Sequence, residues 1–452
     1  MNNSLAIKLG TIAALIVSLL IPLQMIGGVI KERQSHREHV LQDIARSSSY
    51  RQQITGPLLV VPYRKMVHEW KVNPSTQERY VEQSEVSGFL CFLPETFTLN
   101  GQMQTEIRKR GIYEARLYHA TNHIGGYYTI PTQWGITEDF SDYRFDQPFL
   151  ALGISDIRGI ENAMKITLNG ETVNFQPGSQ VKLLGDGVHA QLPRDIGPQQ
   201  VRLDFAFDLK LQGTGQMDIT PVGRESNVKL SSDWPNPSFI GDYLPADRNV
   251  SSVGFNAHWQ TSFFSTNLEE ALQNCLQKSS CEEFNNRHFG VSLVDPVDQY
   301  LKSDRAIKYA LLFIALTFGG FFLFEILKRL AVHAIQYSLV GMALATFYLL
   351  LLSLSEHIGF SQAYAISSTA CVLLIGTYIS SVLHSVLRGL GFAAGLAALY
   401  GLLFGLLSAE DYALLMGSLL LFGLLGVVMV LTRKVDWFSI SRSTKASALR
   451  AE

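Results

Sequence analysis

Long apolar runs stand near both ends of the chain, and an ordinary mixture of apolar and polar residues lies between them. The first run, Leu9–Ile30, is long enough to cross a hydrocarbon core of about 30 Å at about 1.5 Å per residue. A signal peptide would have a more basic start than the single Lys8, a shorter apolar stretch and a small-residue exit. The run therefore predicts an uncleaved membrane anchor, in which Pro22 is a tolerated kink.

The polar stretch after the anchor keeps a helical pattern. Val40, Leu41 and Ile44 recur at helical spacing within it. A narrow apolar stripe of this kind is typical of a helix that covers a surface. We therefore expect the first helix to continue beyond the membrane.

Five further apolar runs, separated by short polar segments, lie in the last third of the chain. Each is long enough to span a bilayer. They are Tyr309–Leu327, Ile335–Ser353, Gln362–Leu383, Leu390–Ser408 and Tyr412–Thr432. With the anchor they predict an α-helical membrane protein of about six spans. In the fifth span, two pairs of glycines four residues apart predict close helix packing; they are Gly391 with Gly395 and Gly401 with Gly405.

From about residue 56 to residue 296 the pattern changes to strands and turns. Val201–Leu211 places an apolar residue at every odd position, which predicts a half-buried strand. Lys165–Phe175 has an Asn-Gly pair between two alternating runs, which is typical of a β-hairpin. Phe97–Gly101 (FTLNG) echoes Ile166–Gly170 (ITLNG), which leaves open a duplication of a β lobe. This middle part is predicted to be a large, mostly β domain.

These patterns divide the chain into four parts: a tip and anchor at 1–30, a mostly β domain at 31–307, a five-helix membrane cluster at 308–433 and a tail at 434–452. Six spans would gather positive charges on one side; these are Lys328, Arg329, Arg388, Arg433, Lys434, Arg442, Lys445 and Arg450. The opposite short loops carry Glu356, Glu410 and Asp411. The positive-inside rule then predicts cytoplasmic termini and an extracytoplasmic β domain between spans one and two.

Composition agrees with this organisation. Hydrophobic residues make up 47% and charged residues 17% of the 452 residues, and the net charge of −2 gives no basic patch for nucleic acid. Cys275 and Cys281 fall in the part predicted to be extracytoplasmic, where disulfides form. The two would face different ways on a regular helix, so a bridge between them requires a loop.

Glu325 is the carboxylate that stands well inside an apolar run. Intramembrane charges often act as proton or ion relays. However, Lys328 and Arg329 follow at three and four residues, so the three side chains would share one helix face at the inner interface. We therefore predict an interfacial ion pair of Glu325 with Lys328 and Arg329, with a relay as the alternative.

Signs of catalysis are missing from the sequence. It contains no P-loop, Rossmann, G-x-S-x-G or H-E-x-x-H motif. His36 and His39 read as part of a solvated helix and His119 and His123 as part of a loop, and no Cys, Asp or Glu cluster completes a ligand set for either pair. We expect no catalytic residues, no cofactor and no metal.

Aromatic residues beside stiff turns are the better candidates for function. Trp234, Phe239 and Trp259 lie near a proline-rich turn and could anchor a partner. Glu356 and His357 lie at the predicted outer ends of the spans, where a docking surface is expected. Core packing is the expected role of at least one of the aromatic residues.

Several ordered blocks resemble the CreD family of inner membrane proteins over nearly the whole chain. The blocks are Ile54–Pro62, Ser232–Pro245, Gly254–Trp259, Asp298–Tyr300, Asp304–Ala310, Tyr348–Phe360 and Leu431–Trp437. The resemblance implies a multi-pass protein of the bacterial inner membrane that maintains the cell envelope and is associated with colicin tolerance and with responses to β-lactams. It supplies no catalytic residues.

Two hypotheses for function follow. In the first, a non-enzymatic envelope-integrity protein uses a periplasmic β domain to bind an envelope protein, lipid or cell-wall component. In the second, the spans form a small transporter or lipid-handling protein with the β domain as its lid. The scarcity of ionisable residues in the apolar runs favours the first.

Overall fold

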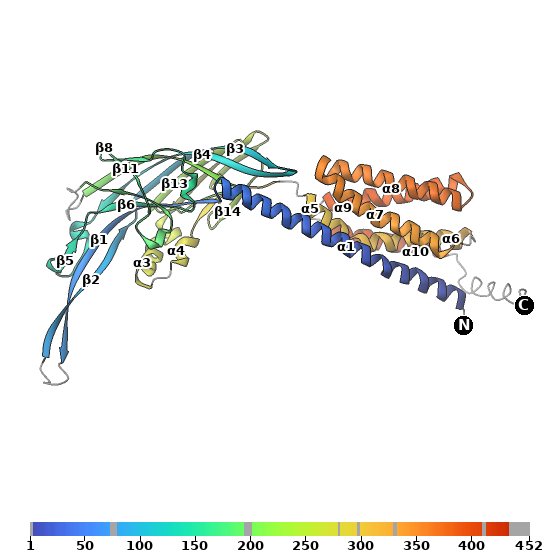
Figure 1. Cartoon of the computed structure of the whole chain (residues 1–452), viewed down its shortest axis with the longest axis horizontal. Helices are drawn as coiled ribbons and strands as arrows, with labels where there is room; N and C mark the ends of the chain where they lie inside the picture. The colour runs from blue at the N-terminus through green and yellow to red at the C-terminus, as the bar shows by residue number, and fades with distance from the viewer. Residues whose placement is uncertain are drawn as a thin grey trace, which may run out of the picture. The chain divides into compact units, whose positions relative to one another are not determined.

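The computed structural model describes residues 3–72, 79–193, 201–278, 281–295, 299–328, 332–408 and 413–433. The chain divides into two compact units, which are Met1–Glu38 with Val297–Glu452, and His39–Pro296. Figure 1 labels their helices and strands. These divisions differ from the sequence boundaries at 30 and 307, because the first helix continues past the anchor and a further helix precedes the later spans.

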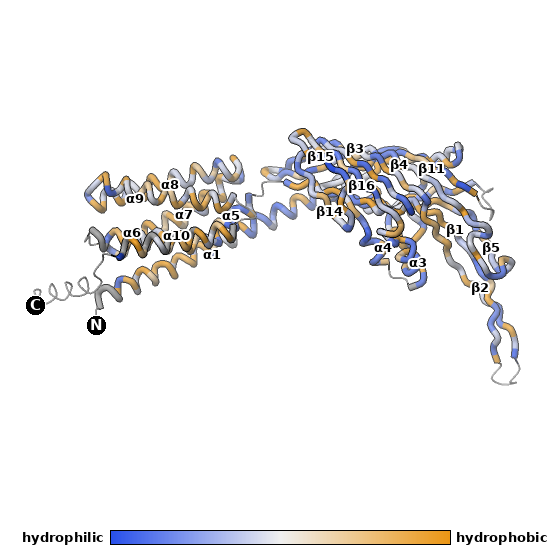
Figure 2. Tube along the Cα trace, turned by 180° about the vertical axis from the view of Figure 1, so that it is seen from behind, coloured by the Kyte–Doolittle hydropathy of each residue, from blue (hydrophilic) through white to orange (hydrophobic). Residues whose placement is uncertain are grey.

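Helix α1 (Asn3–Ser47) is 45 residues long and continues through Pro22. In Figure 2 its first half is mostly hydrophobic and the following part is hydrophilic. Near its end, Val40, Leu41 and Ile44 pack against Ala115 and Leu117 of the β domain. The predicted extension of the first helix is therefore confirmed.

The membrane unit consists of helices that follow the predicted apolar runs. They are α5 (Gln299–Lys308), α6 (Ala310–Lys328), α7 (Ala334–Ile358), α8 (Phe360–Val382), α9 (Val386–Ser408) and α10 (Ala413–Thr432). Among the described residues, four helices (α1, α7, α8 and α9) are long and apolar enough to cross a membrane, or five if α5 and α6, bent by 46°, form one span. The protein is therefore a membrane protein, and α5 is a helix that the apolar pattern did not predict.

The predicted glycine packing in α9 is wrong at three positions. A β-carbon added at Gly391, Gly395 or Gly401 would meet no atom within 4 Å. Helix α9 instead contacts α8 closely at Gly389, where an added β-carbon would collide with Ser380. Among the described residues, nothing lies within 4 Å of an added β-carbon at those three positions, so the close contact of α9 with α8 is made at a different glycine.

The second unit is the predicted mostly β domain, built from two sheets. The nine-stranded sheet has the order β14-β17-β12-β1-β6-β10-β9, with β2 and β5 also paired to β1. Its strands are β1 (Gln52–Val72), β2 (Arg79–Phe92), β5 (Tyr143–Phe145), β6 (Phe149–Ile154), β9 (Gln176–Pro177), β10 (Gly187–Gln191), β12 (Gln216–Ile219), β14 (Pro237–Gly241) and β17 (Phe289–Leu293).

The eight-stranded sheet has the order β15-β16-β13-β3-β4-β11-β7-β8. Its strands are β3 (Thr96–Arg110), β4 (Tyr113–Ile130), β7 (Lys165–Leu168), β8 (Glu171–Asn174), β11 (Val201–Thr214), β13 (Glu225–Ser232), β15 (Asp247–Ser251) and β16 (Gly254–Ser262). One large core lies between the sheets, and the odd residues of β11 point into it from Leu203 to Leu211.

Helices α3 (Leu268–Lys278) and α4 (Glu282–Asn286) add to this core. Leu268, Leu272 and Phe284 are buried in it. In β1 the four consecutive residues Leu58–Val61 are all buried, as expected for a strand covered on both faces.

The predicted hairpin is confirmed, but the pentapeptide echo is not a structural repeat. Asn169 and Gly170 connect β7 to β8 with φ of 46° and 93°, the left-handed values that a tight two-residue hairpin requires. The matching segment Phe97–Gly101 runs straight through β3 without a turn. The same five-residue pattern therefore serves two different local structures.

Candidate functional site

A polar groove with a volume of about 720 Å³ lies on the outer face of the eight-stranded sheet. It crosses β15, β16, β13, β3 and β4. Its lining consists mostly of amide, hydroxyl and imidazole side chains: Asn100, Gly101, Gln102, Thr121, His123, Lys229, Leu230, Ser231, Asp247, Arg248, Asn249, Asn256, Ala257 and His258. We refer to this set as the outer groove.

Strand alternation places the side chains of the outer groove. In β3, Phe97 and Leu99 are completely buried in the core, while Asn100 and Gln102 between the buried positions are exposed. Because successive side chains of a strand point to opposite faces, one face of each strand holds the core and the other supplies the groove.

Cross-strand register aligns these side chains into rows. In one row, Lys229 stands opposite both His258 and Asn100, and Asn100 stands opposite His123. Strands lie about 4.8 Å apart, so a row across five strands is about 19 Å wide. The groove therefore offers a long line of polar groups rather than a single point.

Partners within the protein are unevenly distributed in the outer groove. His258 contacts Asn227 at 3.1 Å, and His123 contacts Asp208 at 2.6 Å. The amides of Asn100 and Asn256 make no side-chain hydrogen bond within the described part of the chain. Each amide can donate and accept, so these groups are available to a polar ligand.

The histidines predicted to lie in a loop are on a strand, because β4 continues through both of them. His119 lies between Glu106 at 3.1 Å and Glu161 at 2.8 Å. Partial burial lowers the pKa of His119, but the hydrogen bonds to the two carboxylates outweigh it and leave the pKa above its ordinary value. This cluster is an ion-pair network beside the groove and does not line it.

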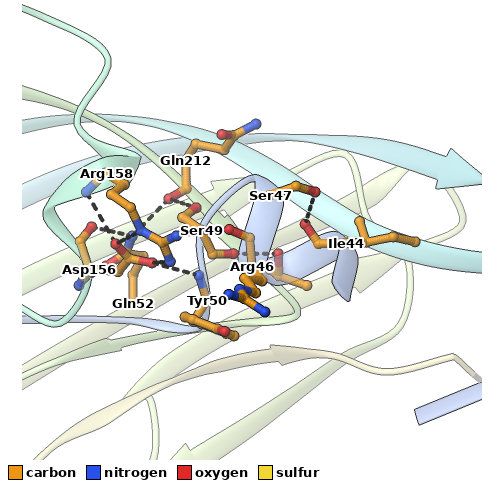
Figure 3. Close-up of polar contacts among 10 residues, drawn as sticks. Ile44, Arg46, Ser47, Ser49, Tyr50, Gln52, Asp156, Arg158 and Gln212 are labelled. Carbon is orange, nitrogen blue, oxygen red and sulfur yellow. Dashed lines mark hydrogen bonds and ion pairs between the residues drawn. The ribbon is translucent and has the colours of Figure 1, made fainter. Parts of the chain in front are cut away.

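A polar cluster joins the end of α1 to the β domain (Figure 3). The Arg158 guanidinium donates to the main-chain oxygen of Arg46 at 2.8 Å and pairs with Asp156 at 2.6 Å. Asp156 also accepts the main-chain N–H of Tyr50 at 3.1 Å. The hydrogen bond from Arg158 holds the pKa of Asp156 below its ordinary value. One arginine thus ties the last turn of the helix to the sheet.

Glu325 has three described partners in the membrane unit. Its carboxylate contacts the Lys8 ammonium of α1 and accepts from the Tyr337 hydroxyl at 3.0 Å and from the Val332 N–H at 3.1 Å. Only 5% of Glu325 is exposed. Its predicted partners, Arg329 and the side chain of Lys328, lie outside the described residues, so that pairing remains a prediction.

A second ion pair involves α1 and Glu356. Arg33 lies 4.0 Å from the Glu356 carboxylate, which also accepts from the Tyr300 hydroxyl at 3.0 Å. Lys8 and Arg33 are 25 residues apart on α1, or about 37 Å at 1.5 Å per residue. The Glu356 side chain is therefore engaged within the protein, whereas the neighbouring His357 is exposed.

The three aromatic residues proposed as partner anchors differ in accessibility. Trp259 is 1% exposed and stacks on Phe289 at 5.1 Å, so its prediction as a surface anchor is wrong because the ring belongs to the core. Phe239 is half-buried against Trp259. Trp234 is half-buried, with the Arg116 guanidinium 3.3 Å from its ring centroid. A partner role for Trp234 and Phe239 remains a prediction.

Cys275 and Cys281 form a disulfide. Helix α3 ends at Lys278 and α4 begins at Glu282, so the two cysteines do not lie on one regular helix. Cys281 immediately precedes α4 and lies outside both helices, which is the departure from a regular helix that a bridge between this pair requires.

The outer groove was not predicted from the sequence, although the sequence holds a signal for it. Between the core positions of β3 stand Thr98, Asn100 and Gln102 rather than lysine or glutamate. A run of uncharged polar residues on the outer face of a strand could have drawn attention to these positions. What could not be foreseen is that β13 would lie beside β3, with β16 next to β13.

Comparison with known proteins places the chain in a family. The family model described as "Inner membrane protein CreD" matches residues 4–438. Inner membrane protein CreD of Escherichia coli (strain K12) is 37% identical over 436 residues, which cover 96% of this chain and 94% of that protein. A solved M1 zinc metallopeptidase from Deinococcus radiodurans is 9% identical over 37% of this chain and 38% of that chain. Its TM-score of 0.19 is too low to indicate a shared fold. The chain therefore belongs to the CreD family of inner membrane proteins.

Proposed function

We propose that this protein is a non-enzymatic envelope-integrity protein whose β domain binds a glycan of the bacterial cell envelope in the outer groove. In this proposal the protein crosses the inner membrane about six times, both termini are cytoplasmic, and the β domain lies in the periplasm. Colicin tolerance and β-lactam response are the expected phenotypes, in keeping with the family resemblance.

The observation that supports the proposal is a second row of side chains, all amides or hydroxyls, that crosses five strands of the eight-stranded sheet beside the row of Lys229. In order across the sheet it consists of Asn249, Asn256, Ser231, Gln102 and Thr121. Asn100, Gln102 and Asn256 can each donate and accept hydrogen bonds. A glycan offers the complementary pattern, because its hydroxyl and acetamido groups also donate and accept. A row about 19 Å wide suits an extended chain better than a single small molecule.

Charge supports a polar ligand of little net charge. Lys229, Arg248 and Asp247 line the groove, and His258 separates Lys229 from Asp247 in their row. Such mixed charges favour neither a strongly acidic nor a strongly basic partner. A glycan strand bearing few charges fits this balance.

The test is co-sedimentation of the full-length protein in detergent with purified peptidoglycan. Replacing Asn100 and Asn256 together by Ala should weaken binding roughly tenfold or more, since each lost hydrogen bond contributes about 0.5–1.5 kcal/mol. Gln260→Ala is the matched control, because this amide lies on the same strand as Asn256 but outside the groove lining. Equal sedimentation of all three proteins would refute a glycan site in the outer groove.

A second test is made in cells. A strain that lacks the protein should regain its colicin and β-lactam responses with the wild-type chain and with Gln260→Ala, but not with the double groove variant at equal abundance. If the double variant restores both responses, the groove does not carry the function.

A further inference from the structure

A second cavity, with a volume of about 450 Å³, lies between α8 and α9 in the membrane unit. Its walls come from both helices. The lining residues are Ser361, Tyr364, Ala365, Ser368, Thr369, Val372, Leu373, Ala397, Tyr400, Gly401 and Phe404. We refer to this set as the lateral groove.

The lateral groove follows one face of each helix. Its residues on α8 recur at three and four positions from Ser361 to Leu373, which is the spacing of a single helix face. Ser361 is the second residue of α8, so the groove begins at one end of the helix. Twelve residues at 1.5 Å each give a length of about 18 Å, close to half of a hydrocarbon core of about 30 Å.

Small residues make room for the groove. Ala365 forms part of one wall, and Ala397 and Gly401 form part of the other. A β-carbon added at Gly401 would meet no atom within 4 Å, so none of the described residues fills this space. Small side chains on both helices therefore form the groove, and each of the two helices is long and apolar enough to cross a membrane.

Three of the five hydroxyls that line the lateral groove are hydrogen-bonded inside the protein. The Tyr364 hydroxyl donates to the main-chain oxygen of Tyr400 at 2.7 Å, and the Tyr400 hydroxyl donates to the Cys371 sulfur at 3.2 Å. The Ser368 hydroxyl donates to the main-chain oxygen of Ala365 at 3.2 Å. What the deeper part of the groove presents to a ligand is therefore mostly carbon, and a polar ligand would gain little there.

We propose that the lateral groove holds one hydrocarbon chain of a membrane lipid, with the polar end of that lipid near Ser361. Its length corresponds to one leaflet, its walls are apolar, and it begins at a helix end, where the polar part of a lipid would lie. This inference does not depend on the proposed glycan binding, because it concerns a different unit of the protein.

The experiment uses the full-length protein in vesicles of phosphatidylethanolamine and phosphatidylglycerol that contain a photoactivatable diazirine in one acyl chain. After illumination, labelled residues are mapped by mass spectrometry. The wild-type protein should carry more label in the lateral groove than at other exposed residues of α7, α8 and α9. In Gly401→Phe, a ring occupies the groove and this excess should be lost.

Gly395→Phe is the matched control, because it makes the same change on the same helix at a position that is equally open but outside the lining. It should keep the excess label. Ala365→Leu narrows the groove from the opposite wall. This variant replaces Gly401→Phe in the experiment if Gly401→Phe does not accumulate in the membrane. Uniform labelling of the three helices in the wild-type protein, or an excess that survives in both groove variants, would overturn the proposal.

Discussion

Glu325 illustrates how a single buried charge is tolerated in an apolar helix. Its carboxylate has a cation, a hydroxyl and a main-chain N–H as partners. An intramembrane carboxylate that changes its protonation state during transport needs a way to lose these partners. The contacts with Lys8 and Tyr337 instead hold α1, α6 and α7 together, which agrees with a structural role.

Glu325→Lys should reduce the amount of folded protein in the membrane, because it places two cations side by side. Removing one partner of a buried pair costs about 3–5 kcal/mol, and the 34% exposure of Lys8 reduces that cost. The exchange Lys8→Glu with Glu325→Lys should restore much of the loss. Abundance in membranes, measured by quantitative immunoblotting, checks both results. No recovery in the exchange would mean that the pair is not the important contact.

Glu325→Gln separates the structural role from the relay. Glutamine still accepts from Lys8 and Tyr337, so the colicin and β-lactam responses should stay close to those of the wild type at equal abundance. A glutamine cannot release a proton. Complete loss of both responses would therefore favour the transporter hypothesis.

Asp218 is a buried carboxylate in the β domain, 4% exposed. Burial raises its pKa above the ordinary value, although the Gln216 side chain donates to it at 2.6 Å. The folded domain thus binds the proton more tightly than the unfolded chain. Stability from this group is present below pH 3.8 and is lost as the pH rises through the raised pKa.

Asp218→Asn should therefore stabilise the protein more at pH 7 than at pH 4, because asparagine is neutral at both. Urea unfolding of the full-length protein in detergent, followed by tryptophan fluorescence, measures the difference. A stability difference between variant and wild type that does not change with pH would contradict the raised pKa.

At the scale of elements, β11 is the simplest case of a sequence pattern that determines an orientation. Leu203, Phe205 and Phe207 point into the core, and Asp204 and Ala206 point out. The alternation was visible in the sequence because this strand is covered on one face. Because of this alternation, a charged side chain is tolerated at the exposed positions of β11 but not at the buried positions next to them.

Phe205→Asp should unfold the β domain, since it loses about 1.5–3 kcal/mol of apolar burial and adds an unpaired buried charge. Leu203→Asp and Phe207→Asp should do the same. Ala206→Asp is the matched control on the exposed face and should leave the domain folded. Protease resistance of the full-length protein distinguishes the outcomes, and equal resistance of Phe205→Asp and Ala206→Asp would exclude the observed orientation of β11.

Other elements were beyond the sequence argument for physical reasons. Residues Leu58–Val61 of β1 form a continuous apolar run because both faces are covered. Such a run is recognisable as a short buried strand between Pro57 and Pro62, but it does not show that β1 extends over 21 residues. Helices α3 and α5 have only 11 and 10 residues. Each carries an amphipathic pattern, but the pattern extends over only about three turns at 3.6 residues per turn. The outer groove depends on which strands lie side by side, and that register is set by contacts far apart in the chain.

At the scale of the whole molecule, topology is the first matter to test. Reporter fusions after Trp437 and within residues 384–389 should report a cytoplasmic location, and fusions within residues 56–296 should report a periplasmic one. The reason is the distribution of Lys and Arg among the short loops. A cytoplasmic result for the middle segment would remove the basis for glycan binding.

The β domain should also fold without the membrane helices. Residues 39–296 enclose one core between two sheets, so this segment expressed alone should be soluble with a circular dichroism spectrum dominated by β structure. A mainly helical spectrum, or recovery only in aggregates, would show that the core depends on the membrane unit.

The order of strands in the nine-stranded sheet has a consequence for biosynthesis. Strand β12 lies between β1 and β17, which are the first and last strands of the domain. Synthesis from Val72 to Leu293 takes roughly 10–45 s at about 5–20 residues per second. During that time β1 has left the ribosome, while later strands of its sheet, among them β12 and β17, are still to be synthesised. A nascent chain halted after Thr214 should therefore be degraded quickly or held by chaperones, whereas one halted after Leu293 should resist proteases.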